Sequence, residues 1–587
     1  MDSEEKNLVV LYGSQTGTCE EVAERICLQS RGTYFKFSCM ALDDYPIDNL
    51  INEELVLFIC STTGQGVPPD NMRRFWKFIM RKSLPHNCLS DLNYSVLGLG
   101  DSSYNKYNFV AKKLFRRVEM LGATAICNLG LADDQHEWGP DAVIDPWTTD
   151  VWKSILSKYP DSSRYLNPLN NLLPPPIYTV QYQNGDNSLQ SIAAEASSGP
   201  YSKDNPFIGS ISANDKVTDD SHFQDTRLIS IDISQANPGF NYTPGDVVMV
   251  LPNNVEKDVN DFLEILPFKS DAVFTFQTSN YETLPFQQPT TLRYLAQTYF
   301  DFKRIPPRSF FQLFSQFSED ENEKEKLIEL GSVEGTDDRY DYVNRPRRTI
   351  LEVMQDFHKT SKLVTLERIL DLIPKMKARA FSIASSPLKH KNTLQILCAV
   401  VAYKTRLLKK ERRGLCSNWL ASLKPTDKVS IWLKRGGISF SSKHPNIFVG
   451  PGTGIAPFRS ACHDFKELNS SEENIVFFGC RGKTKDFYFN DEWPHLNVRL
   501  HVAFSRDNPD KVYVQDLIKE NGPALWKLIS ERNASIYVAG NSKKMPEGVK
   551  DAFLHVFSSC GDMTTEAANE FYQKLQLSKR YQQETWS

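Results

Sequence analysis

The stretch IFVGPGTGIAPFR, which spans Ile447–Arg459, has the pattern of a short apolar strand, a glycine turn and the start of a helix. Gly450, Gly452 and Gly454 allow the backbone to turn tightly and to approach a pyrophosphate closely, and the N–H groups at the helix start then face that anion. Thr453 lies inside the same turn and is a candidate contact for the ligand. A glycine turn by itself is weak evidence, because it can be only a turn. The surrounding motifs therefore decide what it means.

Two predicted strands downstream end in groups that suit a nicotinamide dinucleotide. The run IVFFGCRG places Cys480 at the carboxyl end of one strand, and NVRLHVAFSRD ends the next strand in Ser505 and Arg506. A 2′-hydroxyl of NAD favours an acidic residue at such a strand end, whereas a 2′-phosphate favours cations and hydroxyl groups. We therefore predict NADPH rather than NADH, with an ordinary basic loop as the alternative. The predicted binding set is Ser505, Arg506, Lys511, Val512, Tyr513, Val514 and Gln515.

The chain begins with a second nucleotide-binding pattern. The apolar run LVVLY predicts a buried strand, which is followed by the loop GSQTGT (Gly13–Thr18) and by a helix from Cys19. The loop lacks the GK[ST] ending of a nucleoside-triphosphate loop. Hydroxyl groups of Ser14, Thr16 and Thr18 join the N–H groups of the helix start, which suits a phosphate monoester such as that of FMN. A hydroxyl-rich helix N-cap is the alternative interpretation.

Three further loops support the FMN interpretation. One predicted strand ends in Ser61–Gly66, another ends in Gly98–Asn108, and a third run ends near Asp133 and Asp134. Strands that alternate with helices predict a parallel, doubly wound sheet. Loops at the carboxyl ends of such strands converge on one crevice. With its phosphate-shaped first loop, this segment resembles flavodoxin.

The motifs of the second half also have a recognisable order. RAFSIASS (Arg379–Ser386), the glycine turn, FFGCRG, AFSRD and KVYVQ follow one another as in the ferredoxin–NADP reductase family, which they resemble. Together with the flavodoxin-like start, they make the chain resemble a diflavin reductase. GSQTGT, TTGQG, DDQHEWGPDA, NRPRRTILEV and the ETW ending are most similar to the cytosolic NADPH-dependent diflavin reductases. That resemblance implies electron flow from NADPH to FAD to FMN and on to an anamorsin-type iron–sulfur protein in cytosolic iron–sulfur cluster assembly. It also implies a cytoplasmic location.

The resemblance assigns residues to the FMN site. By position, Ser14, Gln15, Thr16, Gly17, Thr18 and Cys19 would hold the phosphate. The isoalloxazine would be flanked by Ser61, Thr62, Thr63 and Gly64 and by Leu99, Gly100, Asp101, Ser102, Ser103, Tyr104, Asn105, Lys106, Tyr107 and Asn108. Tyr104 would be the stacking aromatic, and Asp134 would lie near the ring edge. Many relatives have an aromatic residue where this chain has Thr63, so the inner face of the flavin is either packed by aliphatic groups or open.

The resemblance also assigns residues to the FAD site and to hydride transfer. The FAD-binding run would be Arg379, Ala380, Phe381 and Ser382, and the second pyrophosphate loop would be Gly414, Leu415, Cys416 and Ser417. Arg379 fits the pyrophosphate, Ser382 can hydrogen-bond near the flavin N5, and either Arg347 or Arg348 would reach the adenine side. Ser382, Cys480 and Glu584 match the hydride-transfer cluster of the family. Trp586 matches the terminal aromatic residue that covers the FAD ring and moves aside for the nicotinamide.

Composition narrows the partners and the compartment. The chain of 587 residues carries a net charge of −4, which argues against nucleic acid as a partner because phosphate binding favours a basic surface. No stretch approaches the roughly 20 apolar residues of a membrane helix, so we expect no membrane anchor, and the first residues do not resemble a signal peptide. Eleven cysteines without a CxxC pair indicate a reducing compartment. No zinc or iron–sulfur ligand spacing is present, so we assign the redox chemistry to organic cofactors and predict no metal site.

We predict a multidomain α/β protein with four segments. Residues 1–158 would form a flavodoxin-like FMN domain with a doubly wound sheet, and residues 159–204 a linker, either a flexible tether or a rigid strap. Residues 205–444 would form a β-barrel FAD domain with a helical connecting insert at about 255–377, and residues 445–587 a Rossmann-like NADP-binding domain. Two other functions stay open: a general NADPH reductase of haem proteins or quinones, and a non-catalytic nucleotide-binding scaffold.

Overall fold

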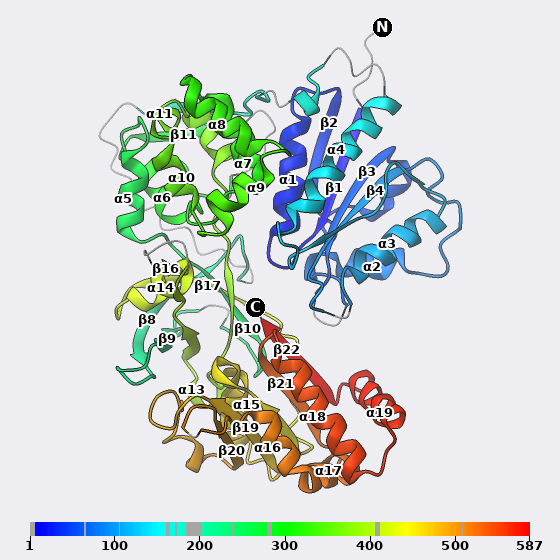
Figure 1. Ribbon diagram of the computed structural model, residues 1–587, viewed down its shortest axis with the longest axis vertical. Helices are drawn as coiled ribbons and strands as arrows, with labels where there is room; N and C mark the ends of the chain where they lie inside the picture. Colours follow the sequence, from blue (N-terminus) through cyan, green and yellow to red (C-terminus); the bar gives the residue numbers. More distant parts are fainter. Residues whose placement is uncertain are drawn as a thin grey trace. The chain divides into compact units, whose positions relative to one another are not determined.

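The computed structural model describes residues 6–63, 66–104, 106–159, 165–170, 173–183, 201–236, 239–278, 284–405, 411–507 and 509–586. The chain forms two compact units (Figure 1). The first consists of Met1–Ser188, Asn254–Lys377 and Lys404–Glu411, and the second of Leu189–Asn253, Ala378–Tyr403 and Arg412–Ser587. The predicted site residues Gly64 and Asn105, and much of the predicted linker, lie outside the described residues. The four predicted domain bounds stay predictions.

The first part of unit one is a parallel sheet with helices on both faces. Its strand order is β2-β1-β3-β4-β5, with β6 beside β4. The strands are β1 (Lys6–Gly13), β2 (Phe35–Ala41), β3 (Leu55–Ser61), β4 (Asn93–Gly100), β5 (Thr124–Ala125) and β6 (Gly130–Asp133). The helices are α1 (Thr18–Ser30), α2 (Arg73–Ile79), α3 (Phe109–Met120) and α4 (Asp141–Lys158). All the strands are parallel, so the loops after β1, β3, β4 and β6 lie along the same edge.

Period-two alternation explains why this sheet is doubly wound. Leu8 and Val10 of β1 pack into a core with α1 and α4, while Val9 and Leu11 pack into a second core with α2 and α3. Successive side chains of a strand point to opposite faces, so an uninterrupted apolar run needs cover on both sides. Figure 1 shows the pair α1 and α4 and the pair α2 and α3 around the sheet.

The second part of unit one is the insert, which is more than a helical bundle. Its helices are α5 (Glu256–Glu264), α6 (Leu292–Thr298), α7 (Arg308–Phe314), α8 (Glu321–Gly331), α9 (Thr336–Arg339), α10 (Ile350–Asp356), α11 (His358–Ser361) and α12 (Leu366–Leu372). Three short strands form a sheet beside them, namely β7 (Tyr178–Tyr182), β11 (Val273–Thr278) and β12 (Thr290–Thr291). The predicted linker thus contributes the strand β7, which pairs antiparallel with β11. The insert core is rich in phenylalanine, with Phe262 and Phe302 stacked at 4.5 Å between ring centroids.

Unit two begins with an antiparallel sheet in the order β13-β10-β17-β8-β9-β14. Its strands are β8 (Phe207–Lys216), β9 (Thr226–Asp232), β10 (Val247–Leu251), β13 (Arg379–Ser382), β14 (Thr393–Ala399) and β17 (Lys428–Lys434). Smaller elements are α13 (Pro387–His390) and α14 (Leu415–Ser422). The short strands β15 (Ala402–Lys404) and β16 (Glu411–Arg413) lie at the boundary, because Lys404 and Glu411 belong to unit one. The two end strands meet at a bridge between Ile383 and Ile396. No continuous ladder joins them in the described part of the chain, so the expected barrel is linked at this one point.

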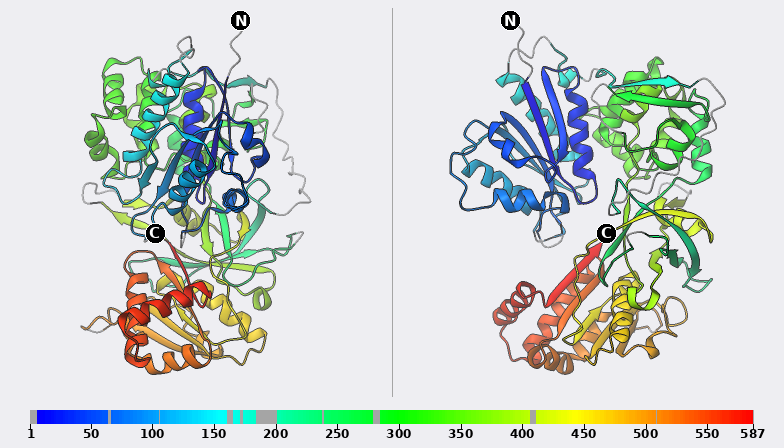
Figure 2. Two further views of the ribbon diagram at one scale, coloured as in Figure 1. Left: turned by 90° about the vertical axis from the view of Figure 1, so that its right-hand side faces the viewer. Right: turned by 180° about the vertical axis from the view of Figure 1, so that it is seen from behind.

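The rest of unit two is a parallel sheet in the order β20-β19-β18-β21-β22. Its strands are β18 (Asn446–Val449), β19 (Asn474–Cys480), β20 (Val498–Phe504), β21 (Ser535–Asn541) and β22 (Tyr581–Trp586). Its helices are α15 (Ala456–Glu467), α16 (Val514–Glu520), α17 (Gly522–Glu531), α18 (Met545–Cys560) and α19 (Thr565–Leu577). The strand β22, drawn in red, lies at the edge of this sheet (Figure 2). It pairs in parallel with β21, which places Trp586 beside Asn541. Among the residues described here, no helix has the length and apolarity needed to cross a membrane.

Candidate functional site

The loop after β1 is organised around one hydroxyl group. The backbone N–H groups of Gly17 and Cys19 donate to Ser14 Oγ at 2.9 and 3.3 Å, so two amide donors of the α1 start converge on one point. Thr16 and Thr18 lie beside them, with their hydroxyl oxygens 3.5 Å apart. This donor set suits a phosphate monoester. The side chain of Gln15 is bonded to Asp70, and Cys19 is fully buried, so these two residues can offer only their backbone to a phosphate.

The other loops of this sheet edge hold one another in place. Thr62 Oγ1 accepts a hydrogen bond from the N–H of Val110 at 3.1 Å, and the N–H of Asp134 donates to the carbonyl oxygen of Gly100 at 2.9 Å. The Tyr107 hydroxyl donates to the carbonyl oxygen of Leu131 at 2.7 Å. The loops after β3, β4 and β6 therefore form one connected rim.

Two residues of this rim bear on flavin stacking. The Thr63 hydroxyl and N–H both bond the carbonyl oxygen of Val67, at 3.1 and 3.0 Å, so its side chain is turned into its own loop. Tyr107 is fixed through its hydroxyl, whereas Tyr104 is half-buried and has no side-chain hydrogen bond among the described residues. Tyr104 therefore stays the candidate stacking ring. Partial burial raises the pKa of Asp134, and the carboxylates of Asp101 and Asp133 raise it further.

The predicted FAD contacts are divided between the two units. In unit two, Arg379–Ser382 forms β13, in which Ser382 is paired with Val247 of β10. The predicted second pyrophosphate loop, Gly414–Ser417, is the N-terminal turn of α14, and Ser417 Oγ accepts a hydrogen bond from the N–H of Val401 at 3.0 Å. The small residues there stand at a helix N-terminus, which fits a pyrophosphate.

Arg347 and Arg348 belong to the insert in unit one and have different surroundings. The Arg348 guanidinium pairs with Asp356 and lies 4.3 Å from the ring centroid of Tyr342. Arg347 is exposed, and no ion pair of its side chain is found in the described part of the chain. Of the two, Arg347 has the guanidinium that is available to a ligand.

The glycine turn after β18 leaves open space. A Cβ at Gly454 would lie 2.1 Å from the carbonyl oxygen of Ala539, so only glycine fits there, against β21. A Cβ at Gly452, whose φ is +58°, would meet nothing within 4 Å. Thr453 lies between them, and α15 starts two residues after Gly454. The result is a bare backbone cradle at a helix start, which fits a pyrophosphate.

The predicted 2′-phosphate set lies at the neighbouring strand end. Ser505 and Arg506 follow β20, while Lys511 and Val512 precede the start of α16. Tyr513 is the N-cap of α16, and Val514 and Gln515 are its first two residues. Arg506, Lys511 and Tyr513 are exposed, and over the described ranges neither cation has a carboxylate partner. Two uncompensated cations at this position fit a phosphate.

The predicted hydride-transfer residues share one core cluster or border on it. Cys480 is 7% exposed, and burial raises the pKa of its thiol. Trp586 packs against the cluster that contains Cys480 and Ala384, and Ala384 follows Ser382 by two residues. Glu584 lies on β22 with Trp586; its Oε1 accepts a hydrogen bond from the N–H of Gly437 at 3.3 Å, and its Oε2 is buried without a described partner. Burial raises the pKa of Glu584, and nearby Asp246 adds to this.

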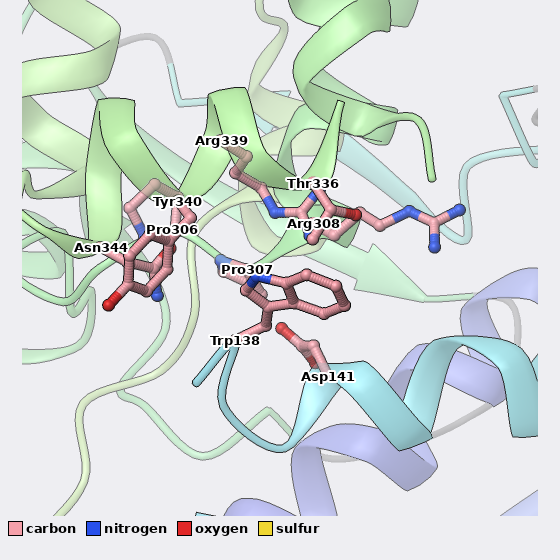
Figure 3. A pocket seen from close by; sticks show the side chains of 9 residues that line it. All are labelled: Trp138, Asp141, Pro306, Pro307, Arg308, Thr336, Arg339, Tyr340 and Asn344. Carbon is pink, nitrogen blue, oxygen red and sulfur yellow. The ribbon is translucent and has the colours of Figure 1, made fainter. Parts of the chain in front are cut away.

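A polar crevice in unit one is not this site (Figure 3). It lies between Trp138 and Asp141, at the start of α4, and insert residues that include Arg308 and Arg339. Its internal volume of about 30 Å³ has room for roughly one water molecule, and no predicted site residue lines it. The crevice therefore belongs to the contact between α4 and the insert.

Sequence reasoning missed the residues that join the strand β13 to the helix after the glycine turn. Arg459 was visible as the last residue of the glycine motif, but its partners Glu492, Ala384 and Gln395 lie far away in the sequence. A signal was present, because Arg459 interrupts an otherwise apolar helix start and a buried arginine needs partners.

Comparison with known proteins gives matches along nearly the whole chain. Three family models match: flavodoxin over residues 10–147, the FAD binding domain over residues 199–419 and the oxidoreductase NAD-binding domain over residues 448–551. A protein of Xenopus laevis named NADPH-dependent diflavin oxidoreductase 1 is 45% identical over 99% of this chain and 100% of its own length. A protein of the same name from Schizosaccharomyces pombe is 34% identical over 99% of this chain and 99% of its own length. Another from Arabidopsis thaliana is 34% identical over the full length of both chains.

Proposed function

The chain belongs to the NADPH-dependent diflavin oxidoreductase family, and from this premise we propose that its electron acceptor is an anamorsin-type iron–sulfur protein of cytosolic iron–sulfur cluster assembly. The chain is an NADPH-dependent oxidoreductase that uses FMN, FAD and NADPH and transfers electrons to an acceptor protein. The observation that carries the acceptor proposal is end-to-end similarity to one group of diflavin reductases, together with the GSQTGT, TTGQG and ETW motifs. The same similarity supports a cytoplasmic location.

The protein's part in this chemistry is to bind and orient. When bound, NADPH supplies a hydride and the two flavins divide the electron pair into single electrons. We propose that the α1 loop around Ser14 holds the FMN phosphate and that Arg506 and Lys511 hold the 2′-phosphate of NADPH. Of the two insert arginines, Arg347 is the better candidate for the adenine side of FAD, because Asp356 already pairs with Arg348.

Four residues would act around the reacting carbon and nitrogen. The buried Glu584 Oε2 can accept a hydrogen bond, and together with Cys480 it would stabilise charge that develops on the nicotinamide. Trp586 would cover the flavin ring and exclude water until the nicotinamide arrives. Ser382, at the end of β13, would hydrogen-bond near the flavin N5.

The acceptor proposal can be tested with the purified protein. Flavin extraction should give one FMN and one FAD, and NADPH should bleach both. The NADPH-reduced enzyme should then reduce an anamorsin-type iron–sulfur protein far faster than cytochrome c or a quinone. Equal rates with all three acceptors would favour a general reductase, and a colourless protein after reconstitution would favour the scaffold interpretation.

The 2′-phosphate assignment has its own test. Replacing Arg506 with alanine removes an exposed guanidinium that has no carboxylate partner among the described residues, so the fold should be unaffected. The variant should lose affinity for NADPH by about 10- to 100-fold, because a charge-assisted hydrogen bond contributes about 1.5–3 kcal/mol. NADH affinity should hardly change. Equal losses for NADPH and NADH would contradict the assignment.

A further inference from the structure

Helix α15 is hydrogen-bonded to the segment that follows the flavin strand β13. Arg459 Nη1 donates to the carbonyl oxygen of Ala384 at 2.8 Å, and Ser460 Oγ donates to that of Ser385 at 2.6 Å. Ser386 Oγ in turn donates to Asp464 Oδ1 at 2.8 Å. Three consecutive residues just beyond β13, each without exposed surface, are therefore bound to the helix that begins at the glycine turn. A displacement of either element must be transmitted to the other.

Arg459 is the centre of this connection. It is 3% exposed, and its Nε and Nη2 donate to the two carboxylate oxygens of Glu492 at 2.7 and 2.8 Å. Its Nη1 also donates to Gln395 Oε1 of β14 at 2.9 Å, and the guanidinium lies 4.4 Å from the ring centroid of Phe489. The planar guanidinium thus joins three separate chain segments, a geometry that an ammonium group cannot reproduce.

The carboxylate of Glu492, which pairs with Arg459, has a second partner on α15. His463, one helical turn further along α15, lies with Nε2 2.9 Å from Glu492 Oε2. The backbone of Gln395 is tied to the same segment, because its N–H donates to Ser385 Oγ at 2.9 Å. The three guanidinium nitrogens of Arg459 thus each donate to a group of a neighbouring segment, which makes it a residue that acts by holding those segments together.

We propose that Arg459 is a positioning residue that fixes the end of the flavin strand β13 relative to the nicotinamide-binding turn at Gly450–Gly454. This inference rests on the proposed route from NADPH to FAD. Hydride transfer needs the donor and acceptor atoms in close, aligned contact, and a misplacement of about 1 Å can lower the rate by about 100-fold. Arg459 connects the two elements that must carry those atoms.

The test compares the wild-type holoenzyme with Arg459→Lys, which keeps the charge and removes the planar fork. At saturating NADPH, the limiting rate of FAD reduction should fall by about 10- to 100-fold in anaerobic rapid mixing. The dissociation constant of NADP⁺ from the oxidised enzyme should stay within about twofold of wild type, because Arg506 and Lys511 are unchanged. Backbone hydrogen exchange at residues 383–386 should increase, and this readout is independent of turnover.

A matched control lies at the same junction. Glu467 of α15 faces Lys389 of α13 across 3.9 Å, and both side chains are largely exposed. Glu467→Gln should leave the rate and the exchange unchanged, since such exposed pairs contribute little.

The outcomes separate this inference from the proposed function. If NADPH does not reduce FAD in the wild type, the proposed electron route is wrong. If wild-type FAD is reduced and Arg459→Lys has the same limiting rate, the positioning role is wrong, whatever the exchange data show. If Arg459→Lys does not retain FAD, the same assays are made with Glu492→Gln, which removes the carboxylate partner of Arg459 and leaves the arginine in place. A slower limiting rate of FAD reduction in this variant supports the positioning role, and a wild-type rate overturns it.

Discussion

Charged side chains make two contacts that can be compared, one between α1 and the insert in unit one and one between α15 and the end of β13 in unit two. The charged groups bond to different kinds of partner in the two contacts. Within unit one, acidic residues of α1 and α4 face basic residues of the insert, and Arg31 of the FMN part faces an acidic residue of α12. The pairs are Glu20–Lys375, Glu24–Lys375, Glu21–Lys377, Glu21–Arg304, Asp145–Arg308 and Arg31–Asp371. Within unit two, the α15 contact relies on Arg459, whose guanidinium reaches a backbone carbonyl and an amide besides its carboxylate.

This difference separates a contact that salt can weaken from one that it cannot. Ion pairs between partly exposed side chains are screened by salt, and water can replace either partner. Bonds from a buried guanidinium to fixed neutral acceptors have no such substitute. The α1 contact borders the loop after β1, for which we propose the FMN phosphate. The α15 contact links β13 to the glycine turn after β18, and we propose that hydride transfer needs these two elements in a fixed relative position.

The largest effect should come from Glu492→Gln, which leaves Arg459 buried without its counter-charge. Burial alone would raise the pKa of Glu492, but hydrogen bonds from His463 and Arg459 outweigh it and lower the pKa to about 2. A shift of that size from the ordinary 4.5 would correspond to about 3 kcal/mol for a fully buried group, and because the Glu492 side chain is 32% exposed, screening by water should reduce it to about 2 kcal/mol at neutral pH. Urea unfolding of the holoenzyme at pH 7, followed by FAD release, should show this loss. Glu467→Gln should lose less than about 0.5 kcal/mol, and equal losses would remove the distinction between buried and exposed pairs.

Lowering the pH below about 4.5 should reduce the difference in stability between the wild type and Glu492→Gln. The pKa of Glu492 is lower in the folded state, so its stabilising contribution is complete above about pH 4.5 and is lost as the pH falls towards 2. The stability gap between wild type and Glu492→Gln should therefore shrink by about 1 kcal/mol between pH 7 and pH 3. Urea titrations at pH 7, 5, 4 and 3 measure it. A gap that stays constant would mean that the carboxylate is not ionised in this network.

The local patterns of the chain predicted its nucleotide-binding folds but not these contacts. LVVLY–GSQTGT and IFVGPGTGIAPFR each encode a strand, a turn and a helix start within about a dozen neighbouring residues, and both became parallel sheets with the loops on one edge. Arg459 bonds a carbonyl 75 residues earlier and a carboxylate 33 residues later, and Lys375 bonds Glu20 across 355 residues. Hydrophobic periodicity within a short window of sequence cannot predict contacts between residues so far apart.

The insert shows the same limit. Its pattern predicted helices, and α8 forms over the charged run EDENEKEKLIELG. Strands β11 and β12 were not foreseen, and β7 comes from a stretch that we expected to be linker. Whether a short segment forms a strand depends on pairing with partners far along the chain more than on its own sequence.

A smaller effect should follow from Lys375→Gln in the α1 contact. Burial alone would lower the pKa of Lys375, but Glu24 and Glu20 outweigh it and raise the pKa, so this ammonium is the shared counter-charge of both carboxylates. Its removal should weaken the contact by about 1–2 kcal/mol. Hydrogen exchange in α1 should then increase by roughly 5- to 30-fold, while exchange at residues 383–386 stays unchanged. Lys326→Gln, which removes an exposed pair with Glu329 on α8, is the matched control.

The smallest effect should come from salt alone, and it tests both contacts in one sample. Raising the ionic strength from about 0.05 M to 0.5 M shortens the screening length from more than 10 Å to about 4 Å. Pairs with exposed members, such as Glu24 with its carboxylate 47% exposed, should weaken by a total of about 1 kcal/mol or less. Hydrogen exchange in α1 should rise by about two- to fivefold in the wild type and by less in Lys375→Gln, which has already lost two of the six pairs. Exchange at residues 383–386 should not respond.

If exchange in α1 and at residues 383–386 responds equally to salt, the two contacts do not differ in their dependence on ion pairs. If neither segment responds, hydrogen bonds and apolar packing beneath α1, rather than its ion pairs, hold the flavodoxin-like sheet against the insert.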